Sequence, residues 1–375
     1  MMDIRFGIAT DLHIALPHTV PSTTNRFHRT EHSIAAFDAA LAKFSELDLD
    51  ALLISGDLTQ DGEIDNHLWL SQRLSQLPYP VYVIPGNHDI VSPQGGEGTI
   101  SADAFRRCYA SCGYANAEKL YYSQLIAPQV RLIGLNSVFF DGGKQTYRGQ
   151  IDHAQLQWLV EILDASENEL VMVMVHHNVI EHLPGQAQSH LGQRYMLQNA
   201  PELLEILSHY GVQLIFTGHL HVQDIAQGSY PHPIYDIATG STVSYPHPFR
   251  VMQYREASPG KGQMQIESHF VQQIPGIDDL QQESREFMSD RSYPFIKRLL
   301  TDDPLGLDEA AAHQLLPELR YFWADIARGD AEFRFPHFEP AARHYFEQFS
   351  CTAPVDNATT LQITRPIGMS LAPLP

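Results

Sequence analysis

Short apolar runs recur along the first 221 residues of the chain, and each of them leads into Asp, Asn or His. The clearest run, at residues 83–86, ends in Pro-Gly and continues as Asn87-His88-Asp89. A short apolar run that stops at Pro-Gly is typical of a buried strand ending in a tight turn. Four other runs lie at residues 8–10, 52–55, 171–175 and 214–217. They lead into Asp11 and His13, into Asp57, into His176 and His177, and into His219 and His221. The pattern predicts five strands that deliver polar side chains at their carboxyl ends.

Amphipathic segments separate these runs and predict helices. Residues 33–47 place Ile34, Phe37, Leu41 and Phe44 on one stripe, as the buried face of a surface helix requires. Further helices are predicted at residues 65–77, 151–163 and 201–210. Strands that alternate with helices in this way indicate an α/β fold.

Further strands are predicted outside the five runs. Residues 121–125 and 131–135 look like neighbouring strands. Beyond His221, strands are expected at residues 234–238, 249–255 and 264–271, with a hairpin turn at residues 259–262.

The composition changes after Ile274-Pro275-Gly276, and this change divides the chain into three predicted parts. Residues 1–274 carry all the strands described above and form the expected catalytic domain. Residues 275–350 carry helical patches at 310–316, 319–327 and 341–349 that are dense in aromatic side chains. We expect this helical extension to act as a brace, a lid or a dimer contact, because a protein in water does not leave so much apolar surface uncovered. Residues 351–375, with repeated Pro and Thr, are predicted to form an irregular tail.

Charge and composition exclude several function classes. The chain has 24 Lys and Arg against 44 Asp and Glu, which gives a formal net charge of −20. Such a surface repels the phosphate backbone of nucleic acids. No apolar run approaches the roughly 20 residues that a membrane helix needs. Three cysteines, an odd number, do not predict a disulfide framework. We therefore expect a cytoplasmic protein without a membrane or nucleic-acid partner.

Any one of the five polar motifs is a weak signal in a chain with 20 histidines, because a buried histidine is usually a core residue that is hydrogen-bonded to backbone. The five together are a strong signal, since open α/β sheets bind ligands at the carboxyl ends of their strands. Taken in order, they resemble the five motifs of the calcineurin-like metallophosphoesterases. The resemblance covers roughly residues 4–270. It implies a layered α/β (α+β) fold, in which two mixed β-sheets pack as a sandwich flanked by helices.

Further details resemble the class III cyclic nucleotide phosphodiesterase and glycerophosphodiesterase branch of that superfamily. These details are Gly56-Asp57-Leu58-Thr59, Arg148-Gly149-Gln150 and Phe249-Arg250-Val251. The chain departs from the branch at Asn178-Val179, where two prolines are usual. This departure leaves His176 in place and concerns the shape of the substrate pocket.

The resemblance implies a site for two divalent or trivalent transition metal ions. Asp11, His13, Asp57 and His221 would hold the first ion, and Asp57, Asn87, His176 and His219 the second. This mixture of carboxylate, amide and imidazole ligands suits Mn, Fe or Zn rather than Mg or Ca alone. If residues 218–221 are extended, His219 and His221 point to the same side, because side chains repeat with period two along a strand.

The resemblance also assigns catalytic roles to two residues. His88 would face the leaving oxygen as a proton donor or hydrogen-bond donor, and Asp89 would hold its orientation. Two features stay open. His177 either reaches the substrate or packs, and Arg26, His28 and Arg29 either border the substrate or belong to a surface loop.

These inferences predict a metal-dependent phosphoric ester hydrolase that attacks a small phosphodiester, of the cyclic nucleotide or glycerophosphodiester class, with activated water. The alternatives are a phosphomonoesterase, a protein phosphatase or a nuclease that uses the same site, and a scaffold that has lost catalysis. A nuclease should show a basic groove, which this composition does not favour. The helical extension could also join two copies of the chain.

Overall fold

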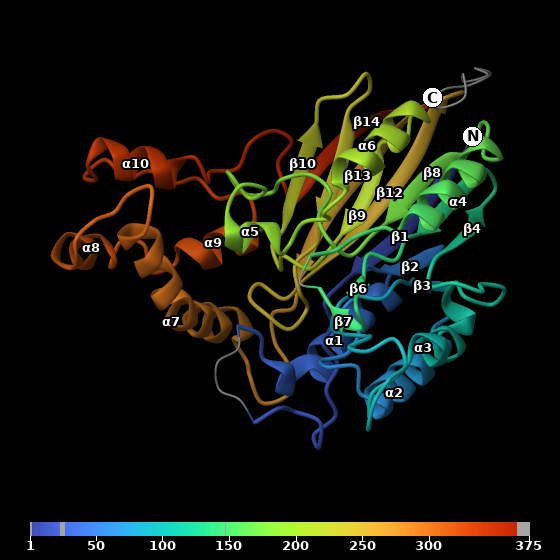
Figure 1. Ribbon diagram of the computed structural model, residues 1–375, viewed down its shortest axis with the longest axis horizontal. Helices are drawn as coiled ribbons and strands as arrows, with labels where there is room; N and C mark the ends of the chain where they lie inside the picture. Colours follow the sequence, from blue (N-terminus) through green and yellow to red (C-terminus); the bar gives the residue numbers. More distant parts are fainter. Residues whose placement is uncertain (1, 23–26, 147, 366–375) are drawn as a thin grey trace.

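Two six-stranded sheets lie face to face in the computed structural model, which describes residues 2–22, 27–146 and 148–365 (Figure 1). The first sheet has the order β14-β13-β12-β1-β2-β3. Its strands are β1 (Asp3–Ala9), β2 (Ala51–Ile54), β3 (Val81–Val83), β12 (Pro248–Ser258), β13 (Lys261–Phe270) and β14 (Ala358–Thr364). Strands β1, β2 and β3 are parallel, whereas β12, β13 and β14 continue the sheet in antiparallel pairs. The carboxyl ends of β1, β2 and β3 therefore share one edge.

The second sheet has the order β10-β11-β9-β8-β5-β4. Its strands are β4 (Tyr122–Ala127), β5 (Val130–Gly134), β8 (Leu170–Met174), β9 (Leu214–Thr217), β10 (Asp224–Gly228) and β11 (Ile234–Ala238). The four central strands are parallel, and β4 and β10 are antiparallel edges. A two-stranded hairpin, β6 (Phe140–Asp141) with β7 (Lys144–Gln145), lies apart from both sheets.

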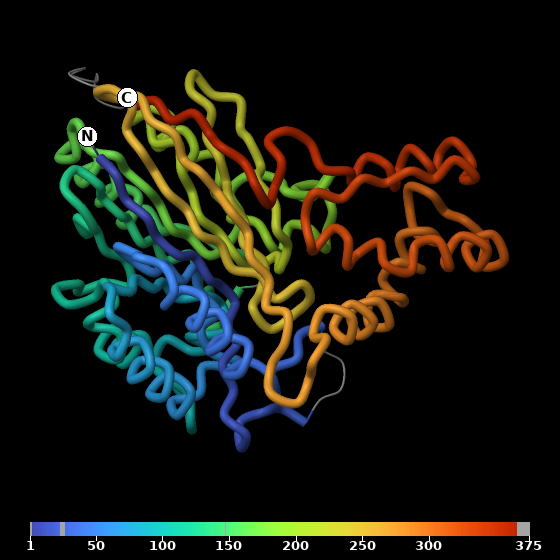
Figure 2. Tube along the Cα trace, turned by 180° about the vertical axis from the view of Figure 1, so that it is seen from behind, coloured from blue at the N-terminus to red at the C-terminus, as the bar shows by residue number. Residues whose placement is uncertain are grey.

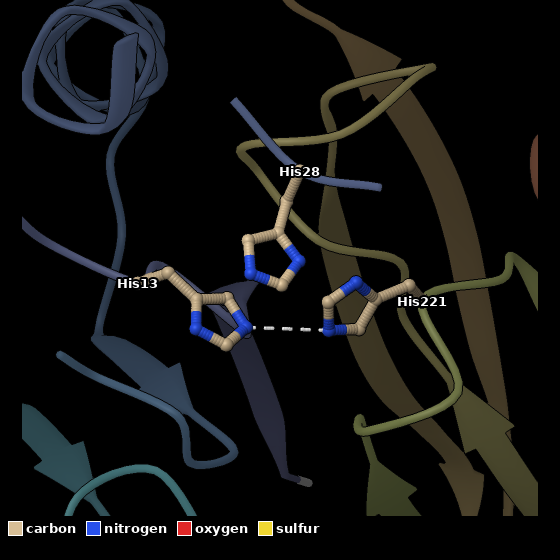
Figure 3. A group of neighbouring side chains, drawn as sticks. All are labelled: His13, His28 and His221. Atoms are coloured by element: carbon tan, nitrogen blue, oxygen red, sulfur yellow. Dashed lines mark hydrogen bonds between the residues drawn. The ribbon is translucent and has the colours of Figure 1, made fainter. Parts of the chain in front are cut away.

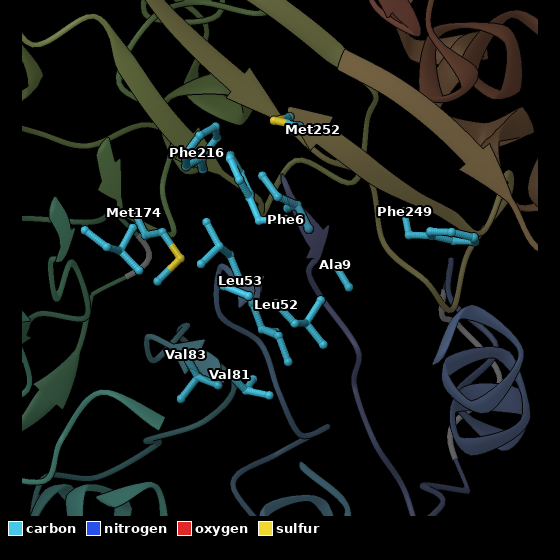
Figure 4. Close-up of a cluster of buried hydrophobic side chains, with 14 of the residues drawn as sticks. Phe6, Ala9, Leu52, Leu53, Val81, Val83, Met174, Phe216, Phe249 and Met252 are labelled. Carbon is cyan, nitrogen blue, oxygen red and sulfur yellow. The ribbon is translucent and has the colours of Figure 1, made fainter. Parts of the chain in front are cut away.

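The alternation of side chains along β8 shows how the layers form. Leu170, Met172 and Met174 belong to the core between the two sheets, whereas Val171 and Val173 belong to a separate core beneath helices. This is the period of two that a strand imposes on its side chains. Between the sheets, Phe6 of β1 meets the edge of Phe216 of β9, with ring centroids 5.7 Å apart (Figure 4).

Helices cover the outer faces of both sheets. Helices α1 (Ser33–Ser45), α2 (Ile64–Ser75) and α3 (Ala102–Cys108) pack on the first sheet, and α4 (His153–Asp164) and α6 (Ala200–His209) pack on the second. Short turns of helix lie at η1 (Thr30–His32), η2 (Ala110–Cys112) and α5 (His190–Gln193). The predicted fold class, a sandwich of two mixed sheets flanked by helices, is confirmed. Among the described residues, we find no helix that is both long and apolar enough to cross a membrane.

A group of helices at one side of the sandwich forms a third apolar core (Figure 2). These helices are α7 (Leu280–Thr301), α8 (Glu309–Leu315), α9 (Phe322–Arg328) and α10 (Pro340–Glu347). Their core also includes Leu220, Val222 and Tyr245, which lie beside the ends of the sheet strands. The three predicted helical patches correspond to α8, α9 and α10. The domain boundary after residue 274 stays a prediction.

Sequence reasoning missed α7, the longest helix of the described chain. Its buried side chains lie at every fourth position, but two of these positions, 284 and 292, hold serine instead of an apolar residue. Pro294 lies inside the helix as well. The apolar periodicity that predicts a helix is therefore interrupted.

The prediction of an irregular tail over residues 351–375 is wrong for residues 358–364. These residues form β14, which pairs antiparallel with β13 and carries Leu361 and Ile363 into the core between the sheets. The pairing depends on a partner almost 100 positions earlier in the chain, and the local sequence carries little sign of it. Residues 366–375 lie outside the described residues.

A buried ion pair joins the segment after β8 to β10 and β11. His182 Nδ1 lies 2.6 Å from Asp224 Oδ2, and its Nε2 lies 3.3 Å from Asp236 Oδ2. Asp236 also accepts hydrogen bonds from the backbone of Val179 and from the Thr217 hydroxyl at the end of β9. The segment after β8, which carries His176, and the end of β9, which leads to His219 and His221, are thus both hydrogen-bonded to the carboxylate of Asp236.

Truncation after residue 273 should produce an aggregating protein. The cut removes the helical segment and β14, so it exposes the apolar side chains of Leu220, Val222 and Tyr245 and the edge of β13. Each large apolar side chain that loses its cover forfeits roughly 1.5–3 kcal/mol, and an open strand edge invites pairing with other chains. Size-exclusion chromatography with light scattering, with a chain ending at residue 365 as control, measures the effect. A soluble, monomeric product would contradict this view.

The His182 ion pair should make stability depend on pH above neutrality. Burial by itself lowers the pKa of His182, but the neighbouring carboxylates of Asp236 and Asp224 more than offset this and raise the pKa to about 10. A folded-state pKa above the ordinary 6.5 contributes stability that is complete below pH 6.5 and is lost as the pH rises toward 10.

We therefore expect His182→Gln to lower the free energy of unfolding by about 3 kcal/mol or more at pH 6.5. This gap between the wild type and the variant should shrink as the pH approaches 10. Urea unfolding at pH 6.5, 8 and 9.5 measures the gap, with His153→Gln, which changes an exposed histidine, as control. A gap that stays constant over this range would refute the assignment.

Candidate metal centre

The carboxyl ends of strands from both sheets meet at one place, where they bring the predicted ligands together. Ligand atoms of Asp11, His13, Asp57 and His221 all lie within 4.8 Å of one another, and we call these residues the first cluster. Ligand atoms of Asp57, His176 and His219 also lie within 4.8 Å of one another. With Asn87, whose Oδ1 lies 3.2 Å from His176 Nε2, they form the second cluster. Asp57 belongs to both clusters.

In the first cluster, ring nitrogens and carboxylate oxygens face a common point. His13 Nε2 lies 3.3 Å from His221 Nε2, as Figure 3 shows, and 3.8 Å from Asp57 Oδ2. His221 Nε2 lies 3.1 Å from Asp11 Oδ1. Burial, followed by the neighbouring His28 and His88, holds the pKa of His13 well below its usual range. The neutral form of the ring is the one that binds a metal ion.

In the second cluster, the backbone fixes which nitrogen of His176 faces inward. His176 Nδ1 donates to the carbonyl of Ser55 at 2.8 Å, so Nε2 points to Asp57 Oδ2 at 3.3 Å. A backbone hydrogen bond on the outer nitrogen is the usual arrangement for a metal-binding histidine. His219 Nε2 donates to the carbonyl of Arg194 at 3.2 Å. Burial, together with His177 and His176, holds the pKa of His219 well below its usual range.

Strained backbone gathers at these clusters. Among the described residues, nine that are not glycine have positive φ, and five of them are cluster residues: Asp11, His13, Asp57, His219 and His221. The left-handed conformation costs an ordinary residue roughly 1–2 kcal/mol, and such strain persists where the surrounding structure enforces it. Residues 218–221 are not extended, so the condition under which His219 and His221 would point to the same side is not met. Strand β9 ends at Thr217, and His219 and His221 turn toward different clusters.

Two glycines allow the strand ends to approach the carboxylates. A Cβ atom on Gly86 would lie 2.2 Å from Asp57 Oδ1, and one on Gly218 would lie 2.4 Å from Asp11 Oδ2. Both distances are far shorter than any contact that a real side chain makes. These positions therefore require glycine if the carboxylates are to stay where they are.

The residues fit a pair of metal ions. Asp11 and Asp57 are almost completely buried, and the side chains that surround them are mainly imidazoles. Burying carboxylates is unfavourable unless positive charge compensates them. Carboxylate, amide and imidazole donors converge twice around one shared carboxylate, which suits two adjacent transition metal ions.

His88 lies beside the clusters, and Gln60 and Asp61 orient its ring instead of Asp89. Its Nδ1 donates to the carbonyl of Gln60 at 2.6 Å and lies 3.5 Å from Asp61 Oδ1. Its ring meets His13 edge to face at 4.8 Å. The prediction that Asp89 orients His88 is wrong. The carboxylate of Asp89 turns back to the amides of Gly86 and Thr59, at 2.8 and 2.9 Å, and so stabilises the tight turn.

The sequence left the roles of some side chains at the site open, and it did not indicate others at all. His177 is buried, with Nδ1 2.8 Å from Ser137 Oγ and its ring against His219, so it packs behind the second cluster. His28 stacks on His13. Tyr195, whose ring lies 5.2 Å from His219, was missed because it follows no motif. Arg26 lies outside the described residues.

Comparisons with known proteins agree with this arrangement. The family model described as calcineurin-like phosphoesterase matches residues 4–223. Proteins of this family use two divalent metal ions.

Several curated relatives match at modest identity. A probable cyclic nucleotide phosphodiesterase of Pseudoalteromonas sp. is 29% identical over 49% of this chain and 61% of its own length. A 3',5'-cyclic-nucleotide phosphodiesterase of Nostoc sp. is 28% identical over 59% of this chain and 72% of its own length. A probable glycerophosphodiester phosphodiesterase of Arcobacter nitrofigilis is 24% identical over 46% of this chain and 56% of its own length. The matched region thus spans about three fifths of the first of these relatives.

Among solved structures, a 5'-nucleotidase precursor from Thermus thermophilus is 14% identical, with a TM-score of 0.42, over 80% of this chain and 60% of its own. The family match covers more than half of the 375 residues, and all five strand-end motifs lie inside it. The chain therefore belongs to the calcineurin-like phosphoesterase family.

Proposed function

We propose that this protein is a two-metal phosphodiesterase that hydrolyses a small phosphodiester of the cyclic nucleotide or glycerophosphodiester class. The observation that carries the proposal is that the buried carboxylate of Asp57 is shared by two clusters of ligand atoms. The names of the curated relatives support a diester substrate of this class.

Asp11, His13, Asp57 and His221 would hold one metal ion, and Asp57, Asn87, His176 and His219 the other. The donor set favours Mn, Fe or Zn. Two such ions, when bound, supply an activated water molecule and neutralise the charge on the phosphoryl oxygens. The backbone amide of His88 donates to Asp57 Oδ1 at 2.9 Å, which fixes one oxygen of the shared carboxylate.

His88 would serve the leaving group. Gln60 and Asp61 hold its Nδ1, so Nε2 is the nitrogen that meets the substrate. As the oxygen of water bonds to phosphorus and gives up a proton to solvent, the bond from phosphorus to the leaving oxygen would break, and His88 Nε2 would transfer its proton to that oxygen. A positioned acid of this kind contributes roughly 10²–10⁴ in rate.

The alternatives are less well supported. A nuclease needs a surface that attracts the phosphate backbone, and the net charge of −20 repels it. A scaffold without catalysis has no reason to keep the strained and buried clusters. A phosphomonoesterase or a protein phosphatase would use the same ligands, so substrate preference separates these from a diesterase.

The manganese-loaded protein should hydrolyse bis-p-nitrophenyl phosphate faster than p-nitrophenyl phosphate. A diesterase site fits one negative charge and two ester groups, whereas the monoester carries an additional charge. Release of p-nitrophenolate at saturating manganese measures both rates. Cyclic AMP and a glycerophosphodiester, assayed in parallel, identify the substrate class. A higher rate with the monoester would refute the diesterase assignment within the family.

Asp57→Ala and His88→Ala should separate metal binding from catalysis. Asp57→Ala removes the shared carboxylate, so we expect both bound metal and activity to be lost. His88→Ala should keep its metal while its turnover falls by roughly 10²-fold or more, and the fall should be smallest for p-nitrophenolate, which needs little protonation to leave. Elemental analysis of the purified proteins measures the metal. A metal content in His88→Ala as low as that in Asp57→Ala would show that His88 is a ligand.

A further inference from the structure

His28 reaches the first cluster from a loop that is not a strand end. It lies between β1 and α1, and its ring stacks on His13 with centroids 4.4 Å apart and planes 10° from parallel (Figure 3). The ring lies 5.5 Å from His221 and 6.4 Å from His88. His28 and His88 thus stand on two sides of His13, beside the place where the substrate would bind.

Ligand atoms of His13, His28 and His221 lie within 4.8 Å of one another, but the stacking on His13 makes His28 a neighbour of the first metal position and not an additional ligand there. A histidine nitrogen offers its lone pair in the plane of the ring, so two rings that bind one ion both have that ion in their planes. Two parallel rings stacked face to face have no such common point. In this arrangement, His28 and His13 cannot bind the same ion.

Helix α7 of the C-terminal segment holds the loop that carries His28. The guanidinium of the next residue, Arg29, pairs with the carboxylate of Glu283 and lies over the ring of Phe287, 5.6 Å from its centroid. The Arg29 side chain is only 15% exposed, whereas that of Glu283 is 49% exposed. The backbone amide of Arg29 also donates to the carbonyl of Val243 at 2.9 Å.

Helix α7 is itself fixed to the sandwich near this contact. Buried His247, in the loop before β12, has its Nε2 2.7 Å from Ser284 Oγ, one residue beyond Glu283. Its Nδ1 donates to the carbonyl of Thr242 at 2.8 Å. A chain of direct contacts therefore runs from the sandwich through α7 and Arg29 to the residue that lies on His13.

We propose that His28 binds the phosphoryl group of the substrate through a ring N–H and that helix α7 positions it through the Glu283–Arg29 ion pair. Arg29 and Glu283 are positioning residues, because they touch the His28 loop and not the clusters. This inference rests on the proposed function, and it gives the C-terminal helices a part in the site.

The first test is binding of inorganic phosphate to the manganese-loaded protein by isothermal titration calorimetry. A hydrogen bond to a charged group contributes roughly 1.5–3 kcal/mol, so His28→Ala should raise the phosphate Kd about tenfold or more and raise KM for bis-p-nitrophenyl phosphate. Manganese content should equal that of the wild type. His28→Gln, which keeps an N–H donor, should recover part of the affinity.

The matched control is His18→Ala, which changes a histidine of the same loop that pairs with exposed Asp65. It should leave the phosphate Kd unchanged. An unchanged Kd and KM in His28→Ala would overturn the proposal, and so would a loss of manganese as large as that in Asp11→Ala, since His28 would then be a ligand.

The second test asks whether α7 acts through His28. Glu283→Gln should raise the phosphate Kd in the wild-type background but have no further effect in His28→Ala, because the loop then presents no imidazole to position. Glu286→Gln is the control, since Glu286 lies on the same helix but pairs with Arg320 and Tyr321 of the helical segment. Equal effects of Glu283→Gln in both backgrounds would overturn the positioning role.

These outcomes are distinguishable from failure of the proposed function. Wild-type protein that binds phosphate but hydrolyses no diester would refute the diesterase activity and leave the His28 assignment standing. If the wild type hydrolyses diesters and His28→Ala changes neither Kd nor KM, the diesterase activity stands and the His28 assignment is refuted. Absence of phosphate binding by the manganese-loaded wild type would overturn the His28 proposal.

Discussion

The carboxylate of Asp57, buried between two sheets, is the constraint on which the rest of the site depends. A buried negative charge is unfavourable unless positive charge or hydrogen-bond donors surround it. Asp57 accepts a hydrogen bond from the amide of His88 and faces histidines of both sheets, which would hold the metal ions that supply the positive charge. These groups reach Asp57 only because several strands end at one place and because the backbone beyond them turns into left-handed conformations. The packing of the two sheets holds that strained backbone in place, so the stability of the sandwich and the geometry of the site are linked.

The sequence predicted the parts of this arrangement that depend on local patterns. Apolar runs that end in Asp, Asn or His identified the strand ends, because strand periodicity and Pro-Gly turns are encoded locally. The direction of side chains beyond the strand ends was not predictable in the same way. In an extended segment His219 and His221 would point to the same side, but both have positive φ. Asp89 was expected to face His88, but the turn that it belongs to offers it closer backbone donors.

The C-terminal third was less predictable because distant contacts decide its structure. Helix α7 buries serines at two of its core positions, and one of them, Ser284, meets a histidine from the loop before β12. Strand β14 forms because β13 offers an open edge, and nothing nearby in the sequence specifies that pairing. His28 was noticed only because it lies near the first motif in the chain. Its contact with His13 depends on an ion pair between Arg29 and a residue 254 positions later.

The order of the first sheet has a consequence for how the protein is made. Strand β1 is flanked by β2, which follows it closely in the chain, and by β12, which is about 245 residues later. During synthesis the ribosome releases all the proposed metal ligands, through His221, before β12, β13 and β14 exist. The backbone amides and carbonyls on one side of β1 therefore stay unpaired until β12 has been synthesised. Unpaired strand edges favour association with other nascent chains. The ligands emerge early, but the sheet that fixes their positions closes only when residue 364 has left the ribosome.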